Sequence, residues 1–430
     1  MLGMSSSALG ETDRSNVLKI YNWSDYIDES LLEEFKTWYY EQTGEKVEIV
    51  YQLFDINEIM LAKIERGHAD YDLVCPSDYI VERMLNLGLV QPISHDFGST
   101  PDYTSNVAPF IDELFGKLNA GVNEDGTKRD ARDYAVGYMW GTVGFIYNKK
   151  YVKAEEIQSW GGLWNPKFAK MFFLKDAFRD VYSPMLIYLN ADRIAAGEVT
   201  IEDLMWDTSD ESIKAVEDLL LSLRDNVLGW EADFGKDMMT QEMAWISLGW
   251  SGDAKWAVDE AKAVNVELDY LVPQEGSNVW FDAWMIPKYA KNVKAASYFI
   301  NFLCMSENAI RNMDETGYVS VIGTPEVLEA MSERAMEEGT TSTVDASYFF
   351  EGQTEVVLDP ILYPDRSVID RCALMHDSGD RTEVLLEMWS RVKGDSARGW
   401  MKVLIGVLVV GAIAAAVVLK IKGGKKKKRK

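Results

Sequence analysis

The stretch VLKIYNWSDYIDESLLEEFKTWYYEQTGEKVEIVY, residues 17–51, predicts a strand, a helix and a second strand in that order. Its first five residues form an apolar strand. From Asp28, the expected N-cap, apolar residues recur every three or four positions, the spacing of one helix face, and Gly44 is a typical terminator. The alternating apolar residues of 47–51 then predict the second strand. Because a helical crossover joins parallel strands, the stretch predicts a β-α-β unit.

The same alternation continues along the next segment of the chain. Residues 56–67 predict a helix, residues 72–75 a short buried strand, and residues 80–85 another helix. This order predicts an α/β fold with a largely parallel sheet that helices cover. Ligands of such sheets gather beyond the carboxyl ends of the strands. We therefore expect the loops YNWSDYI (21–27) and PSDY (76–79) at the ligand-binding edge.

The charge balance is strongly acidic and uneven along the 430 residues. The chain has 44 basic and 69 acidic residues, a net charge of −25. Nine of the basic residues and none of the acidic ones lie from Trp400 onward, which leaves a body with 35 basic residues against 69 acidic ones, or −34. Such a body repels nucleic acid and attracts cations, although acidity also serves solubility alone. The length suggests two to three domains.

Neither a disulfide framework nor a metal centre is indicated. The three cysteines cannot all pair and form no CxxC motif, and the three histidines are scattered. There is also no phosphate-binding loop of the G-x-x-x-x-G-K-[ST] type, so the chain is not expected to hydrolyse nucleotides in that way. We expect no cofactor.

The carboxyl end predicts a membrane anchor. Residues 403–419 are an uninterrupted apolar run, at the short end of a membrane span, and the KKKKRK flank should stay in the cytoplasm. A buried helix of a soluble protein is the alternative. We expect residues 396–430 to form a single transmembrane helix with a basic cytoplasmic tail, which places the acidic body outside the membrane, in the periplasm or on the cell surface.

That topology requires an export signal. Residues 1–16 lack a basic region and a full apolar stretch, but their SSALG segment is like the small-residue end of a signal peptide. We expect this segment to be a leader remnant or disordered, with a longer leader either preceding it or already removed.

Four segments place an aromatic ring within a few residues of an aspartate. They are residues 23–26 (WSDY), 179–182 (RDVY), 250–253 (WSGD) and 280–282 (WFD). If they converge, they form a box with ring walls and carboxylates. A flexible diammonium chain fits such a box, since each ammonium gains about 0.5–2 kcal/mol from a ring face in addition to its hydrogen bonds to carboxylates. The alternative for each segment is a core tryptophan beside a surface aspartate.

An enzymatic interpretation of the same residues is the alternative to cation binding. The segment GWSGD (249–253) approaches the nucleophile-elbow motif G-x-S-x-G around Ser251, but Asp253 stands where the second glycine belongs. A surface-anchored hydrolase would need a histidine base, for which His376 is the only downstream candidate, or a catalytic carboxylate pair. The aromatic and acidic composition does not separate carboxylate catalysis from cation binding.

At these motifs the chain resembles the polyamine-binding solute receptors of bacterial ABC importers, which take putrescine and spermidine. YNWSDYI, YDLVCPSDYIVERM, DAFRDVY, LGWSGD, VWFDAWMIPKYAKN and ETGY occur in the order of that family, between residues 18 and 392. The resemblance implies a two-lobed, type II periplasmic-binding fold that closes on its ligand by a hinge. It also implies a receptor without catalytic activity that delivers a polyamine to a permease with a separate ATPase.

The resemblance implies a division of the body into two lobes, each built from two segments. The first lobe would comprise residues 17–138 and 281–325, and the second residues 139–280 and 326–395. The glycine-punctuated stretch YAVGYMWGTVGFIYN (134–148) is the expected crossing between them.

The resemblance also implies a set of ligand-binding side chains, carried over motif by motif. They are Trp23, Ser24, Asp25, Tyr26, Tyr79, Asp180, Trp250, Asp253, Trp280, Asp282 and Tyr318. Asp180 stands where the family usually has the longer Glu, and Ala177 where spermidine receptors tend to have an Asp. These signals are mixed and favour a diamine. The same fold serving another small solute, such as an amino alcohol, a sugar or iron, remains open at this point.

Overall fold

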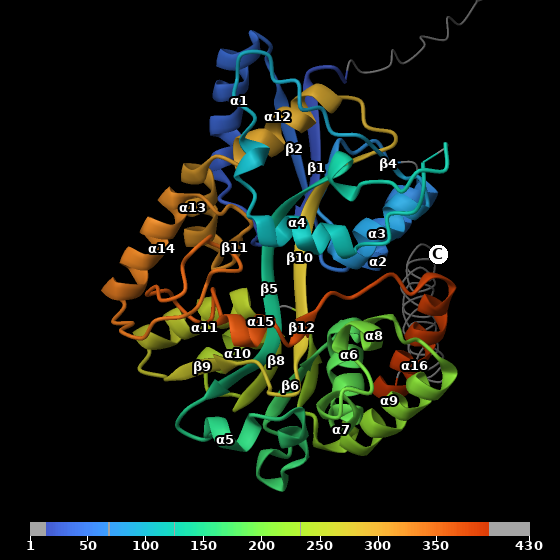
Figure 1. Cartoon of the computed structure of the whole chain (residues 1–430), viewed down its shortest axis with the longest axis vertical. Coiled ribbons are helices and arrows are strands. Elements are labelled where there is room, and N and C mark those ends of the chain that lie inside the picture. Colours follow the sequence, from blue (N-terminus) through green and yellow to red (C-terminus); the bar gives the residue numbers. More distant parts are fainter. Residues whose placement is uncertain (1–13, 68, 124, 233, 395–430) are drawn as a thin grey trace, which may run out of the picture.

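The computed structural model describes residues 14–67, 69–123, 125–232 and 234–394 (Figure 1). Its strands pair to form one sheet, in which a series of strands are consecutive neighbours. In sheet order they are β2 (Glu48–Phe54), β1 (Val17–Trp23), β3 (Leu73–Val74), β10 (Ser277–Pro287), β5 (Ala135–Asn148), β8 (Ile246–Trp250), β6 (Phe172–Lys175) and β7 (Gly229–Glu231). Four short strands pair with the two central members of this series. Strands β4 (Val90–Gln91) and β12 (Cys372–Ala373) pair with β10, and β9 (Leu268–Leu271) and β11 (Val319–Ser320) pair with β5.

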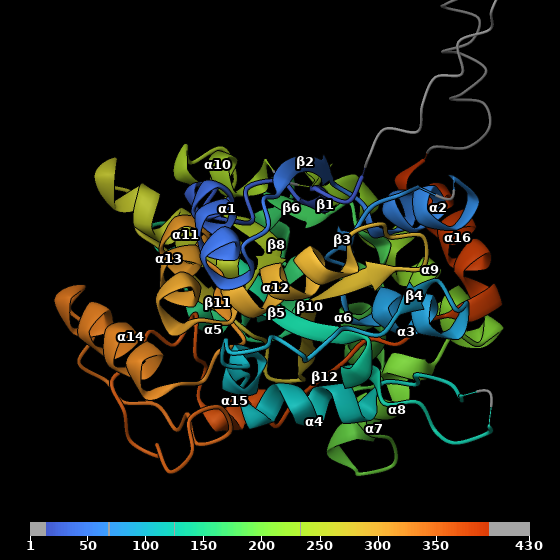
Figure 2. The same cartoon turned by 90° about the horizontal axis from the view of Figure 1, so that it is seen from above.

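Helices surround the strands on all sides when the molecule is viewed from above (Figure 2). In the first third of the chain they are α1 (Ser30–Thr43), α2 (Asn57–Gly67), α3 (Asp78–Asn86) and α4 (Pro109–Lys117). The middle third contributes α5 (Ala154–Ile157), α6 (Phe178–Leu189), α7 (Ala191–Ala195), α8 (Ile201–Trp206), α9 (Asp210–Leu223), α10 (Gly235–Thr240) and α11 (Ser251–Ala263). The last third contributes α12 (Val293–Leu303), α13 (Ser306–Thr316), α14 (Pro325–Glu337), α15 (Arg366–Ile369) and α16 (Thr382–Lys393).

The predicted β-α-β unit is confirmed. Strand β1 pairs in parallel with both β2 and β3, and helix α1 forms the crossover between β1 and β2. Gly44 ends α1 with a φ of 72°, a left-handed conformation that glycine adopts without a steric penalty. The prediction that Asp28 is the N-cap was wrong by one residue. Glu29 holds that position, and Asp28 instead accepts the backbone N–H of Ser30 at 2.9 Å.

Two long antiparallel strands at the centre of the sheet were not predicted as partners. Strands β5 and β10 run side by side through the middle of the molecule in Figure 1, with β1 and β2 at one end and β6, β8 and β9 at the other. Strand β10 pairs with β3 at Met285, and β5 pairs with β8 along residues 143–147. The sheet is therefore antiparallel where β10 meets β3 and β5 and where β5 meets β8, and every residue of β5 and β10 is buried.

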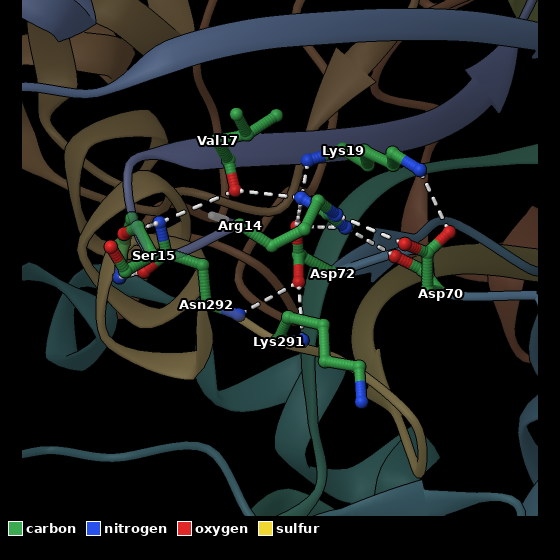
Figure 3. Close-up of polar contacts among 9 residues, drawn as sticks. Arg14, Ser15, Val17, Lys19, Asp70, Asp72, Lys291 and Asn292 are labelled. Atoms are coloured by element: carbon green, nitrogen blue, oxygen red, sulfur yellow. Dashed lines mark hydrogen bonds and ion pairs between the residues drawn. The ribbon is translucent and has the colours of Figure 1, made fainter. Parts of the chain in front are cut away.

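A buried carboxylate ties the start of the described chain to the body (Figure 3). Asp72 has no exposed surface. Its Oδ2 accepts the backbone N–H of Lys19 at 2.8 Å and both terminal nitrogens of Arg14, at 3.2 and 3.3 Å. Its Oδ1 accepts the backbone N–H groups of Lys291 and Asn292 at 2.7 and 2.8 Å. Arg14 thus contacts the folded body, although sequence analysis assigned it to the leader segment.

Within the described ranges, no helix is long and apolar enough to cross a membrane. The predicted anchor and tail, 396–430, lie outside the described residues, as do residues 1–13 of the predicted leader segment.

Candidate ligand-binding site

One cavity of about 570 Å³ is lined by every residue that was predicted to bind the ligand. All eleven line it: Trp23, Ser24, Asp25, Tyr26, Tyr79, Asp180, Trp250, Asp253, Trp280, Asp282 and Tyr318. The structure therefore brings these residues together around one cavity. Their roles toward a ligand remain a prediction.

The cavity lies where sheet topology predicts a ligand. Strand β1 ends at Trp23, β3 is followed by the turn into α3, β6 leads into α6, and β8 leads into α11. The first turns of α3, α6 and α11 then contribute Tyr79, Asp180 and Asp253. Carboxyl ends of strands and amino ends of helices thus converge on one edge, which is the usual ligand site of such sheets.

Asp282 enters the cavity from the middle of a strand, and a register irregularity accompanies it. The pairing of β10 with β5 shifts between Asp282 and Ala283, which is typical of a β-bulge. An isolated bridge also joins Asp282 to Ser77 on the turn before α3. A bulge changes the direction of nearby side chains, so a mid-strand carboxylate reaches a site otherwise built from strand ends.

The carboxyl group of Asp282 is buried and only half satisfied. Its Oδ2 accepts the hydroxyl of Tyr26 at 2.7 Å, whereas its Oδ1 has no hydrogen-bond partner among the described residues. Burial raises the pKa of Asp282 to about 6, against the lowering effect of the polar groups of Ser77 and Tyr26. A buried oxygen that faces a cavity and accepts no hydrogen bond from the protein can accept one from a ligand donor.

Asp180 is another buried carboxylate of the cavity that has no ion-pair partner among the described residues. It stands in the first turn of α6 and is 8% exposed. Burial raises its pKa to about 7, while a hydrogen bond from Trp250 and the charge of Lys175 act in the opposite direction. The negative charges of Asp282 and Glu58 raise this pKa further. A bound cation would offset both the cost of burying the charged carboxylate and its repulsion by the neighbouring negative charges.

Asp253 is in a different state, because protein cations already neutralise it. The Nζ of Lys175 lies 3.1 Å from its Oδ2, and the Nζ of Lys236 lies 3.7 Å from its Oδ1. The hydroxyl of Tyr318 donates to the same Oδ1 at 2.8 Å. Burial acts to raise the pKa of Asp253, but the two lysines and Tyr318 hold it below its ordinary value.

Aromatic rings form the walls of the cavity. The ring of Tyr318 meets Tyr26 and Trp280 edge-on, at centroid distances of 5.1 and 5.8 Å. The indole N–H of Trp23 donates to the carbonyl of Cys75 at 2.8 Å, which fixes its ring at the end of β1. Rigid rings in such contacts offer apolar faces to methylenes and negative faces to cations.

Two predicted residues lie at the rim. Ser24 is half-buried and donates to Asp55 at 3.2 Å. Asp25 is exposed, with a φ of 49° that an aspartate tolerates in a turn. Solvent screens a charge in this position far more than it screens Asp180 or Asp282.

A cationic contact between two lining residues of the cavity was not predicted from the sequence. The guanidinium of Arg179, in α6, lies 4.2 Å from the centroid of the Tyr79 ring in α3. It also donates to the carbonyl of His376 at 2.7 Å, and the Nδ1 of His376 lies 2.8 Å from Glu82 of α3. Arg179 stands inside the quoted DAFRDVY motif, and its position next to Asp180 was a signal that could have identified it.

The hydrolase alternative based on Ser251 has no support in this geometry. Ser251 does not line the cavity, and its buried hydroxyl accepts the backbone N–H of Thr142 at 3.2 Å. His376, the proposed base, contacts Glu82 and Glu202 instead. In the described ranges, no group of three or more His, Cys, Asp or Glu side chains is arranged to hold a metal ion.

The chain belongs to the family of bacterial extracellular solute-binding proteins, whose family model matches residues 31–335. Among its relatives is the putrescine-binding periplasmic protein PotF of Escherichia coli, 30% identical over 317 residues that cover 70% of this chain and 77% of PotF. The spermidine/putrescine-binding periplasmic protein of Salmonella typhimurium is 26% identical over 393 residues, covering 91% of this chain and 95% of that protein.

A solved structure shares the fold. The spermidine/putrescine ABC transporter substrate-binding protein PotD of Streptococcus pneumoniae superposes with a TM-score of 0.62 at 28% identity, covering 88% of this chain and 99% of that one. The α/β fold is thus that of the periplasmic binding proteins. The predictions that the chain is a solute-binding protein and that it is not an enzyme are confirmed.

Proposed function

We propose that this protein captures a polyamine outside the cytoplasm and delivers it to an ABC permease that has its own ATPase. The observation that carries the proposal is the pair of buried carboxylates, Asp180 and Asp282, which have no ion-pair partner among the described residues and line a ring-walled cavity. The relatives named above, which bind putrescine and spermidine, support the same class of ligand.

The binding roles follow from the chemistry of each group. Ammonium groups of the ligand pair with Asp180 and Asp282, and each gains hydrogen bonds that are charge-assisted. Trp23, Trp280 and Tyr318 cover the methylenes and replace water there, at roughly 0.8 kcal/mol for each buried CH₂. Cation–π contacts with these rings add about 0.5–2 kcal/mol for each ammonium.

The remaining predicted residues have supporting roles in this proposal. Tyr26 orients Asp282 through its hydroxyl, and Asp253 fixes Tyr318. Tyr79 and Trp250 complete the walls. The rim residues Ser24 and Asp25 contribute to the attraction of cations toward the opening.

We propose that the protein closes on its ligand as two lobes of the type II binding-protein fold. The lobes are those predicted, 17–138 with 281–325 and 139–280 with 326–395. Strands β5 and β10, which both groups of outer strands share, would carry the hinge. The contact of Arg179 with Tyr79 would hold the closed form. Small-angle scattering with and without amine tests closure, and an unchanged radius of gyration on saturation would argue against it.

The apolar run 403–419 supports a further proposal, that the receptor is tethered to the membrane with its basic tail in the cytoplasm. A tether raises the concentration of the receptor near its permease. The full chain should sediment with membranes and resist extraction by alkaline carbonate, and a chain that ends at Gly399 should not. Equal extraction of both forms would contradict the tether.

Calorimetry with a panel of solutes tests the polyamine assignment. Putrescine, cadaverine and spermidine are compared with ethanolamine, glucose, ferric citrate and the neutral isostere 1,4-butanediol. We expect heat of binding and thermal stabilisation from the di- and polyamines alone. Binding of a neutral solute or of iron in preference to the amines would overturn the proposal.

A further inference from the structure

We propose that the ammonium of Lys175, which is not itself a lining residue, fills the position at the corner of the cavity lined by Trp250 and Asp253 that a ligand ammonium would otherwise take. We propose that it thereby selects ligands with two ammonium groups over ligands with three. This inference rests on the proposed polyamine function. Lys175 is the last residue of β6 and is 1% exposed.

The contacts of the Lys175 ammonium are those that a bound alkylammonium would make. Its Nζ lies 3.1 Å from Asp253, 2.9 Å from Glu231 and 2.8 Å from the carbonyl of Ala232. It also lies 3.9 Å from the centroid of the Trp250 ring. An ammonium has three N–H donors, and three oxygens surround this one. Carboxylates and an aromatic face are the features proposed above for a ligand amine, and here the protein supplies the amine itself.

The charges in this corner balance without a ligand. Asp253 and Glu231 contribute two negative charges, and Lys175 and Lys236 contribute two positive ones at the separations given above. Burial acts to lower the pKa of Lys175, but Asp253 and Glu231 raise it above its ordinary value, so the ammonium stays charged. A ligand amine that entered this corner would meet two cations and carboxylates that are already paired.

The other acidic side chains of the cavity leave two positions for ligand charge. Asp176 is paired with Lys393 at 2.7 Å. Asp78 has no exposed surface to offer a ligand, its Oδ1 accepts the backbone N–H of Tyr79 at 2.7 Å, and burial raises its pKa well above the ordinary value. Asp180 and Asp282, at 8% and 5% exposure, remain as acceptors that line the cavity without an ion-pair partner in the described ranges.

The acidic side chains at the rim of the cavity do not replace the ammonium position that Lys175 fills. Asp25 and Asp55 are exposed and Glu58 is half-buried, so solvent screens a third ammonium held there. The positions for buried ligand charge therefore number two in the described part of the cavity, and they fit a linear diamine.

The test is calorimetric titration of putrescine and spermidine into the full chain and into two variants. In Lys175→Met/Glu231→Gln the internal ammonium and its second carboxylate are removed together, which frees Asp253 without leaving Glu231 charged. In Lys236→Met the half-exposed cation is removed, and the buried pair stays intact. Lys150→Met, at an exposed lysine outside the cavity, is the matched control.

We expect the unchanged protein to bind putrescine at least tenfold more tightly than spermidine. The ratio of the two affinities should shift toward spermidine by at least tenfold in the double variant and about threefold in Lys236→Met, and it should not change in Lys150→Met. A native preference for spermidine, or an unchanged ratio in Lys236→Met, would overturn the inference even if the double variant did not fold. Binding of no amine at all would instead refute the proposed function on which the inference rests.

Discussion

The hydroxyl of Tyr26 donates a hydrogen bond to Oδ2 of Asp282 across 2.7 Å, although the two residues are 256 positions apart. The bond joins the loop after the first strand to the bulge in β10. It leaves Oδ1 of Asp282 without a hydrogen-bond partner in the described part of the chain. The same contact therefore orients the carboxylate and keeps one of its oxygens available for a ligand.

Replacing Asp282 with Asn should weaken binding of putrescine by more than tenfold. The amide keeps the shape of the side chain but leaves a buried ammonium without its counter-charge. Calorimetry measures the affinity, and circular dichroism verifies the fold. Tyr26→Phe, which removes only the orienting hydroxyl, is the matched comparison and should cost less. An affinity for Asp282→Asn within threefold of the original would remove Asp282 from the site.

Binding should depend on pH between about 5 and 8. The pKa values of Asp180 and Asp282 are raised to about 7 and about 6 by burial, so both carboxyls gain protons as the pH falls through this range. Alkyl ammonium groups, with pKa values near that of lysine, stay charged. Because the ligand pairs only with carboxylates, affinity should fall at least tenfold from pH 8 to pH 5.

Proton release provides an independent measurement of the same titration. Near pH 6.5, binding should expel protons from Asp180 and Asp282, so the observed heat should vary with the ionisation enthalpy of the buffer. The Asp180→Asn variant should release fewer protons. Heats that are independent of the buffer would show that both groups are already charged in the free protein.

Asp180 and Asp282 should change the free energy of unfolding with pH in the direction opposite to most acidic groups. Both pKa values are higher in the folded protein than the value near 4 expected in the unfolded chain. The fold thus binds these protons more tightly, and the two groups reduce the free energy of unfolding as pH rises from about 4 to about 7. In the ligand-free protein, Asp180→Asn should flatten this part of the pH profile of chemical denaturation. An unaltered profile would argue against the raised pKa.

Gly252→Ala should impair binding by displacing Tyr318. A Cβ at position 252 would lie 2.2 Å from the Tyr318 ring, so the ring must move and its bond to Asp253 is lost. We expect at least tenfold weaker binding of putrescine. Gly116→Ala is the control, since a Cβ there meets nothing within 4 Å and lies in helix α4. It should leave binding unchanged and raise the free energy of unfolding by about 0.5–1 kcal/mol. Equal affinity of the Gly252→Ala and Gly116→Ala variants for putrescine would contradict the proposed role of Tyr318 as a wall of the cavity.

Asp72→Asn should destabilise the fold without altering the site. The carboxylate accepts five hydrogen bonds (Figure 3), and the amide that replaces it leaves buried donors unpaired. Hydrogen bonds to charged groups contribute roughly 1.5–3 kcal/mol, so we expect a loss of about 2–3 kcal/mol in urea unfolding. The neighbouring Asp70→Asn, at a 41% exposed side chain, should cost less than about 1 kcal/mol. Similar losses for the two variants would contradict this ranking.

The sequence by itself determined the β-α-β order and the composition of the site. Apolar periodicity and terminators such as Gly44 are local signals, and they predicted the parallel pairing of β1 with β2. The resemblance to the polyamine receptors implied eleven ligand-binding residues, and all of them are among the residues that line the cavity. Topology alone predicted only that loops after the strands meet at one edge of the sheet.

Only the tertiary structure decided which carboxylates are available to a ligand. Lys175 and Asp253 are 78 positions apart, and nothing local to either residue indicates that they pair. The bulge at Asp282 likewise depends on the register between β10 and β5, which distant pairing fixes. The charge state of a buried group depends on what surrounds it in space, so chain order cannot set it.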